Sequence, residues 1–125
     1  MIVNKFMMLS VGVTDMGAAK EFYVDKLGLQ VKSDYRQDDN NWWVSLTPPE
    51  GGVTITLTTN YENLMKPGTL KVYFTASSVE ASHKELSEKG ARPEEIKTDL
   101  FGPGSGVKWF SVADPDGNQL LIAQV

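Results

Sequence analysis

Short runs of alternating hydrophobic and polar residues dominate the first half of the chain. The run 7–13 alternates with the two-residue period of a strand. The run 19–27 carries apolar residues at helical spacing, between Asp15, which can cap a helix, and Gly28, which can end one. Three further runs predict strands, at 29–35, 42–47 and 53–58. The first half therefore predicts the order β-α-β-β-β.

The same order begins again after residue 69. A strand is predicted at 70–76. A helix should follow, because Ser77 and Glu80 have the spacing of a capping box at its start, and Gly90 should end it. Strand-like runs follow at 92–97, 107–112 and 120–123. The second half thus repeats the plan of the first.

This repeat predicts a single α+β domain over residues 1–125, made of two βαβββ modules in tandem. The first module is expected at about 5–58, a connector at 59–69 and the second module at about 70–125. Each sheet must hide one face under its helix. The residues expected on that face are Leu9, Val11, Val13, Trp42, Val53, Ile55, Leu57, Val72, Phe74, Leu120 and Ile122.

The opposite sheet face is expected to mix aromatic and small polar side chains. Its candidate ligand-binding residues are Met8, Ser10, Trp43, Ser45, Thr54, Thr56, Lys71, Tyr73, Trp109, Ser111 and Leu121. Such a mixture is typical of the wall of a ligand cavity. A partly solvated face, or a face that a partner subunit covers, would have the same pattern, so the residues alone leave these interpretations open.

Two segments of the chain resemble a known family. The segment 11–29, VGVTDMGAAKEFYVDKLGL, is similar to the opening of glyoxalase, bleomycin-resistance and extradiol-dioxygenase proteins, which form the vicinal-oxygen-chelate superfamily. The turn at 114–118, DPDGN, followed by an apolar strand, resembles the closing signature of that family. The resemblance implies paired modules whose sheets curl around a cleft. It also implies a homodimer, often with the cleft at the subunit interface.

Enzymes of that family hold a divalent metal with four side chains, usually histidine or glutamate. Carried over one at a time, the four positions fall on Met8, Thr56, Lys71 and Leu121. A thioether, a hydroxyl, an ammonium and a hydrocarbon do not make a site for such an ion. We therefore predict no metal and no other cofactor, and we do not expect metal-dependent glyoxalase or dioxygenase activity.

Composition and charge mainly exclude classes of protein and kinds of partner. The 125 residues carry a net charge of −4 with an estimated pI of 4.9, and the lysines are scattered, so a nucleic-acid partner is not expected. No run reaches the roughly 20 apolar residues of a membrane-spanning helix, and no signal-peptide pattern begins the chain. Cysteine is absent, which excludes disulfides and fits a cytoplasmic location.

Few side chains suggest covalent chemistry. His83, the only histidine of the chain, lies in the second predicted helix. A single helical histidine favours a surface or boundary position over a role as a metal ligand. The serines lack the context of a catalytic triad. Lys71 is interpreted as an ammonium that attracts an anionic or phenolic ligand; the alternative is a buried amine that acts as a base or forms an imine.

Together these observations favour a metal-free binding protein, closest in character to the bleomycin-resistance branch, that sequesters a bulky and partly aromatic molecule such as an antibiotic. Stacking is expected from Trp43, Tyr73 and Trp109, hydrogen bonds from Thr54, Thr56 and Ser111, and an apolar floor from Met8 and Leu121. The alternative is a lyase- or isomerase-like enzyme of the same family, which would use Lys71 or Tyr73 without a metal. A partner-binding subunit with a collapsed cleft is a third hypothesis.

Overall fold

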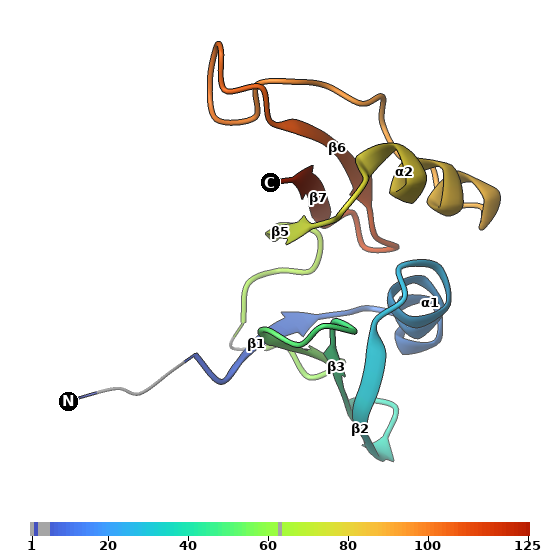
Figure 1. The fold of residues 1–125 in the computed structure, drawn as a ribbon. Coiled ribbons are helices and arrows are strands. Elements are labelled where there is room, and N and C mark those ends of the chain that lie inside the picture. The colour runs from blue at the N-terminus through green and yellow to red at the C-terminus, as the bar shows by residue number, and fades with distance from the viewer. Residues whose placement is uncertain (1, 3–5, 63) are drawn as a thin grey trace. The chain divides into compact units, whose positions relative to one another are not determined.

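The structure, a computed structural model, describes residues 2, 6–62 and 64–125 (Figure 1). The first unit, Met1–Pro67, contains β1 (Met8–Gly12), α1 (Met16–Lys20), the π-helical η1 (Glu21–Lys26), β2 (Gln30–Asp38), β3 (Asn41–Thr47) and β4 (Thr54–Thr58). The second unit, Gly68–Val125, contains β5 (Lys71–Thr75), α2 (Val79–Glu88), β6 (Lys108–Ala113) and β7 (Gln119–Gln124). Two mixed sheets with few helices confirm the predicted α+β class.

The first unit is built on a sheet with the strand order β1-β4-β3-β2. β1 and β4 run parallel, whereas β3 is antiparallel to both of its neighbours. Leu57 pairs with Val11 on one side and with Val44 on the other, and all three are buried. Since register partners point to the same face, these residues form an apolar face on the side of α1, which contacts β4.

The helix of the first unit begins and ends where the sequence predicts. Asp15 caps it, because its Oδ1 accepts a hydrogen bond of 3.0 Å from the backbone N–H of Ala18. The last turn widens, since the N–H of Leu27 donates to the carbonyl of Phe22, five residues earlier, at 2.8 Å. Gly28 then takes a left-handed φ of 90° and ends the helix. The π-helical turn is not visible in the hydrophobic spacing.

The second unit repeats this topology with a smaller sheet, in the order β5-β7-β6. The first and last strands again run parallel, with Lys71 opposite Gln119 as Met8 is opposite Thr54. α2 contacts β6 and β7 on the face that carries the buried Phe110. No helix in the described part of the chain is long and apolar enough to cross a membrane.

Two local predictions for the second module are wrong. The run 92–97 forms no strand. It meets β6 through an isolated bridge between Lys97 and Trp109 and through a hydrogen bond of 2.8 Å from Glu94 N–H to the carbonyl of Ser111. Glu94 and Lys97 are three residues apart whereas their partners on β6 are two apart, so the run does not keep the register of a regular ladder. The helix is capped by Ser78 rather than Ser77. Ser78 has the extended backbone of a cap, and its Oγ accepts a hydrogen bond of 3.1 Å from Ala81 N–H.

The turn at 114–118 is a hydrogen-bonded unit whose two ends, Asp114 and Asn118, are buried. The carboxylate of Asp114 accepts from the backbone N–H of Asp116 at 3.0 Å, and from the backbone N–H and side-chain amide of Asn118 at 2.8 Å each. Asn118 Oδ1 in turn accepts from the N–H groups of Gly68 at 3.0 Å and Leu70 at 2.9 Å. The closing signature therefore has a structural role: it fixes the β6–β7 turn to the chain that enters β5.

Candidate functional site

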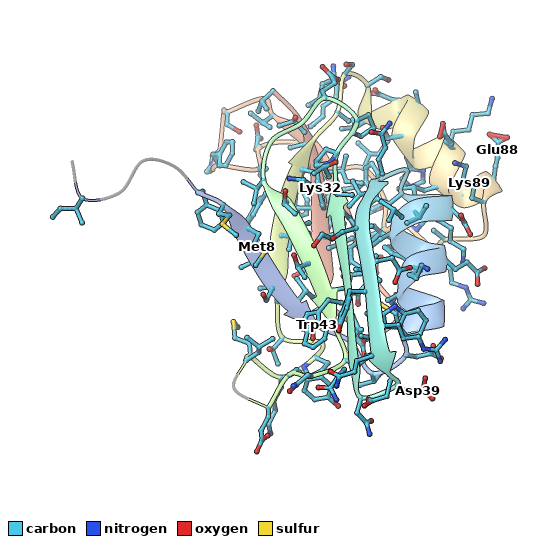
Figure 2. All side chains as sticks on the ribbon, turned by 90° about the horizontal axis from the view of Figure 1, so that it is seen from below. Met8, Lys32, Asp39, Trp43, Glu88 and Lys89 are labelled. Atoms are coloured by element: carbon cyan, nitrogen blue, oxygen red, sulfur yellow. The ribbon has the colours of Figure 1, made fainter. Side chains whose placement is uncertain are left out.

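Each sheet has one face turned away from the helix of its unit, which we call the helix-distal face. On the first sheet this face is formed by Met8, Ser10, Gly12, Ser33, Tyr35, Trp43, Ser45, Thr54, Thr56 and Thr58. These residues alternate with the buried apolar residues of the helix side. Figure 2 shows two of them, Met8 on β1 and Trp43 on β3.

A row of hydroxyl groups crosses this face. Ser10, Thr56, Ser45 and Ser33 are successive register partners on the four strands. Thr56 Oγ1 lies 3.0 Å from Ser45 Oγ and donates to Met8 Sδ at 3.2 Å, so the hydroxyl of Ser45 donates to Thr56. The row can therefore both donate and accept hydrogen bonds along one line of the sheet.

An aromatic row lies next to the hydroxyl row. Its register partners are Gly12, Thr58, Trp43 and Tyr35. The rings of Tyr35 and Trp43 have centroids 5.7 Å apart and are tilted by 38°. Tyr35 is 61% exposed and Trp43 is half-buried, so both rings present surface on which a planar molecule could stack.

Tyr35 and Ser33 reach this face because of a bulge in β2. Val31 pairs with Leu46 and Ser33 with Ser45, which leaves Lys32, labelled in Figure 2, without a partner in the ladder. Regular alternation from Val31 would have placed Ser33 and Tyr35 on the helix side. The sequence therefore predicted the strand but missed these two residues.

Trp42, beside Trp43, faces the helix as predicted. Its Nε1–H donates to Asp34 Oδ1 at 2.7 Å, and Lys20 of α1 donates to Asp34 Oδ2 at 2.7 Å. These two hydrogen bonds, the one from Lys20 first, lower the pKa of Asp34 from its usual range. The guanidinium carbon of Arg36 lies 4.2 Å from the centre of a Trp42 ring. Trp42 thus belongs to a polar cluster that ties α1 to β2 and β3.

The helix-distal face of the second sheet combines aromatic rings with lysines. It carries Lys71, Tyr73, Thr75, Trp109, Ser111, Leu121 and Ala123. Lys97 Nζ lies 5.5 Å from the centre of the Trp109 ring, and Lys71 Nζ lies 5.7 Å from that of Tyr73. Each ring therefore lies within the range of a cation–π interaction.

All the residues proposed from the sequence lie on one of these two faces, but they differ in exposure. The exposed or half-buried ones are Met8, Ser10, Trp43, Ser45, Lys71, Tyr73 and Trp109. The buried ones are Thr54, Thr56, Ser111 and Leu121. The first group has surface that a ligand could contact, whereas the second group has almost none. Contact with a ligand stays a prediction for both groups.

Comparison with known proteins places the chain in a family. The sequence model of the Glyoxalase/Bleomycin resistance protein/Dioxygenase superfamily matches residues 5–122. The chain belongs to this superfamily. The uncharacterised protein YwkD of Bacillus subtilis (strain 168) is 30% identical over 123 residues, which cover 93% of each chain.

Solved structures of other proteins share this fold. TnmS3, an antibiotic binding protein from Streptomyces sp. CB03234, superposes with a TM-score of 0.85 at 26% identity and covers 99% of this chain and 98% of its own. A superfamily member from Sphaerobacter thermophilus DSM 20745 has a TM-score of 0.82 at 24% identity, with full coverage of both chains. The latter likeness shows the fold alone.

The metal that superfamily enzymes use does not fit the residues of this chain. Of the four positions that the family resemblance assigns to metal ligands, Met8 and Thr56 are joined by a hydrogen bond from Thr56 Oγ1 to Met8 Sδ. Lys71 brings a positive charge, and Leu121 brings no donor atom. Across the described residues, no group of three or more His, Asp or Glu side chains could hold an ion.

His83 has structural partners. Its Nε2 lies 2.9 Å from the carbonyl oxygen of Glu94 and therefore donates to it, and its ring meets that of Phe110 edge-on at 5.1 Å. These contacts hold the segment after α2 against β6. The half-buried position agrees with the prediction of a boundary residue.

Proposed function

We propose that this chain is a binding protein that holds a planar, partly aromatic small molecule without a metal and returns it unchanged. The observation that carries the proposal is the aromatic pair of Trp43 and Tyr35 next to the hydroxyl row of Ser10, Thr56 and Ser45. Stacking on the rings supplies affinity. The hydroxyls of Ser10 and Ser45, the latter held by its hydrogen bond to the buried Thr56, fix the orientation of the ligand.

The second sheet supports the same function. Trp109 adds a further stacking surface, and Lys71 and Lys97 place positive charge beside the aromatic rings. A ligand with an anionic or phenolic group would gain affinity both from the stacking surface and from the positive charge. On the first sheet Met8 supplies an exposed apolar contact, whereas Thr54, Ser111 and Leu121 are buried on their own sheet faces.

The likeness to TnmS3 supports an antibiotic as the kind of ligand, because that protein is an antibiotic binding protein and the similarity covers 99% of this chain. Sequestration then requires only burial of the compound and no covalent step. The proposal includes the homodimer expected for the family, with the ligand held in a cleft at the subunit interface.

An enzyme that uses Lys71 or Tyr73 as a base is the second candidate, because Lys71 Nζ lies 5.7 Å from the Tyr73 ring. Lysines that act as bases or imine formers are usually desolvated by burial. Lys71 is exposed and Tyr73 is 55% exposed, which favours attraction of a ligand over catalysis. Product formation that Lys71→Met abolishes would reverse this preference.

Tryptophan fluorescence provides the first test. Purified protein is titrated with planar aromatic natural products and glycopeptide antibiotics, with and without a chelator. We expect saturable quenching that the chelator does not change and that Trp43→Ala or Trp109→Ala weakens. Trp42→Phe is the matched control, since Trp42 lies on the helix side and its removal should leave the affinity intact. A lack of response across the panel would contradict the proposal.

A further inference from the structure

The helix-distal face of the second sheet differs in charge from the chain as a whole. The chain carries 16 acidic and 12 basic residues, yet no strand residue on this face is an aspartate or a glutamate. Lys71 lies on the face itself, and Lys97 is bridged to Trp109 at its outer edge. The strands of this face therefore present positive charge alone, although the net charge of the chain is −4.

The backbone fixes the position of Lys97. Its N–H donates to the carbonyl of Trp109 at 2.8 Å, and its carbonyl accepts from the N–H of Trp109 at 2.9 Å. Two residues that exchange both hydrogen bonds lie directly opposite each other, and their side chains point to the same face. The Nζ of Lys97 accordingly lies 5.5 Å from the centre of the Trp109 ring. The ammonium is therefore held beside the largest aromatic ring of this face.

The two lysines on either side of this sheet differ in their partners. Lys108 points to the helix side of β6 and forms an ion pair of 2.9 Å with Glu80 of α2. None of the ion pairs between described residues includes Lys97. The nearby Glu94 meets β6 and α2 through its backbone. The exposed ammonium of Lys97 thus has an aromatic ring beside it and no carboxylate partner in the described part of the chain.

We infer that the ligand is a planar aromatic anion and that Lys97 is the residue that selects its negative group. This inference rests on the proposed function and names the class of ligand. A ring that contacts the half-buried Trp109 brings a carboxylate or sulfonate on its edge to the ammonium, which can form a charge-assisted hydrogen bond with it. Lys97 gives up no ion pair with a described residue in doing so. The contact uses the exposed surface of the two side chains and needs no enclosed cavity.

The experiment uses isothermal titration calorimetry at low salt with naphthalene-2-sulfonate and naphthalene-2-sulfonamide, which share the ring system, while only the sulfonate is charged at neutral pH. The wild-type chain should bind the sulfonate more tightly than the sulfonamide. In Lys97→Met this preference should fall at least about threefold, the size of an exposed ion pair. Methionine keeps an apolar stem beside Trp109, and the affinity for the sulfonamide reports whether the face is intact.

Two further variants separate the position of the charge from its presence. Lys97→Arg keeps a cation at the same place and should keep the preference for the sulfonate. Lys84→Met removes the same charge from an exposed position on α2, in the same unit, and should leave the ratio of the two affinities at the wild-type value.

The outcomes separate this inference from the proposed function. Wild-type protein that binds both probes with equal affinity overturns the anionic class of ligand and leaves the proposed function in place. A preference for the sulfonate that Lys97→Met keeps, or that Lys84→Met lowers to the same extent, overturns the role of Lys97. Wild-type protein that binds neither probe counts against the proposed function and this inference together.

Discussion

At the scale of single residues, the choice of side chain at Gly12 decides what can lie on the sheet face. The glycine is needed for space rather than for an unusual backbone, because Tyr61 occupies the volume of a side chain at this position. Sequence alone does not reveal this, since Tyr61 lies in the connector, for which no regular pattern predicts a partner.

Gly12→Ala should destabilise the protein by about 1–3 kcal/mol, because a methyl group forced into a filled space displaces its neighbours. The cost should shrink in a Tyr61→Gly background, where the Cβ and Cγ atoms that would clash are gone. Urea denaturation of the two single variants and the double variant measures this coupling. Purely additive free energies of unfolding would show that the two residues are not in contact.

The two adjacent tryptophans of β3 show when strand alternation predicts the sheet face of a side chain correctly. Strand alternation placed Trp43 on the helix-distal face and Trp42 on the helix side, and the contacts of Trp42 with Asp34 confirm the latter. The same rule fails for Tyr35, because the irregular register at Lys32 reverses the faces of β2 beyond it. A bulge depends on pairing with a neighbouring strand, which the local sequence does not encode.

At the scale of elements, the DPDGN turn connects two segments that are distant in sequence. Asn118 is 1% exposed, and its amide bridges the carboxylate of Asp114 and the N–H groups of Gly68 and Leu70. The sequence predicted a turn here, whereas these long-range hydrogen bonds appear only in the structure.

Asn118→Ala should lower the free energy of unfolding by about 2–4 kcal/mol, since it removes the acceptor of the half-buried N–H groups of Gly68 and Leu70 and a hydrogen bond to the buried carboxylate of Asp114. Asn40→Ala changes an exposed asparagine in the β2–β3 turn and should cost no more than about 0.5 kcal/mol. Thermal or urea denaturation compares the two. Equal effects would contradict a structural role for the Asn118 amide.

The cluster of Lys20, Asp34 and Trp42 holds α1 to the outer strands and should make stability depend on pH. The folded state lowers the pKa of Asp34, chiefly through the hydrogen bond from Lys20, so its contribution is present above the ordinary carboxyl pKa of 3.8. That contribution is lost as the pH falls through the lowered pKa. Because the side chains of the pair are 33% exposed, it is small.

Asp34→Asn should therefore cost about 0.5–1 kcal/mol at pH 7, and this difference from the wild type should vanish at strongly acidic pH. Urea denaturation at a series of pH values measures the difference. Asp25→Asn, an exposed residue of η1, removes the same charge away from the cluster and controls for net charge. A cost for Asp34→Asn that stays constant down to acidic pH would contradict the ion pair as its cause.

At the scale of the whole molecule, the repeat was the part of the fold that the sequence predicted best. In both halves the first strand runs parallel to the last, and the pairing begins at Met8–Thr54 in one and at Lys71–Gln119 in the other. Trp43 and Trp109 take equivalent positions, each paired with a residue of the last strand of its half. The strand at 92–97 was not formed, because Glu94 and Lys97 bond to β6 out of the register of a regular ladder. Periodicity thus predicts which residues share a face within a regular strand, whereas pairing between strands decides where a strand bulges and whether it forms.

The positions that the family resemblance assigns to metal ligands also bear on how the whole molecule would bind its ligand. The family resemblance assigns Met8, Thr56, Lys71 and Leu121 to the places that hold metal ligands in superfamily enzymes, and none of these side chains suits a divalent ion. Stacking on Trp43 and Trp109 therefore replaces metal coordination as the proposed source of ligand affinity. The central claim is that the chain binds its ligand intact and without a metal.

Native mass spectrometry tests this claim most directly. Wild-type protein is treated with a chelator, incubated for a long time with a compound found by the fluorescence titration, and weighed as the intact complex. The account predicts a dimer that carries one unmodified ligand per chain and no metal mass. A complex that forms only with a divalent metal bound, or a ligand released with an altered mass, would contradict it.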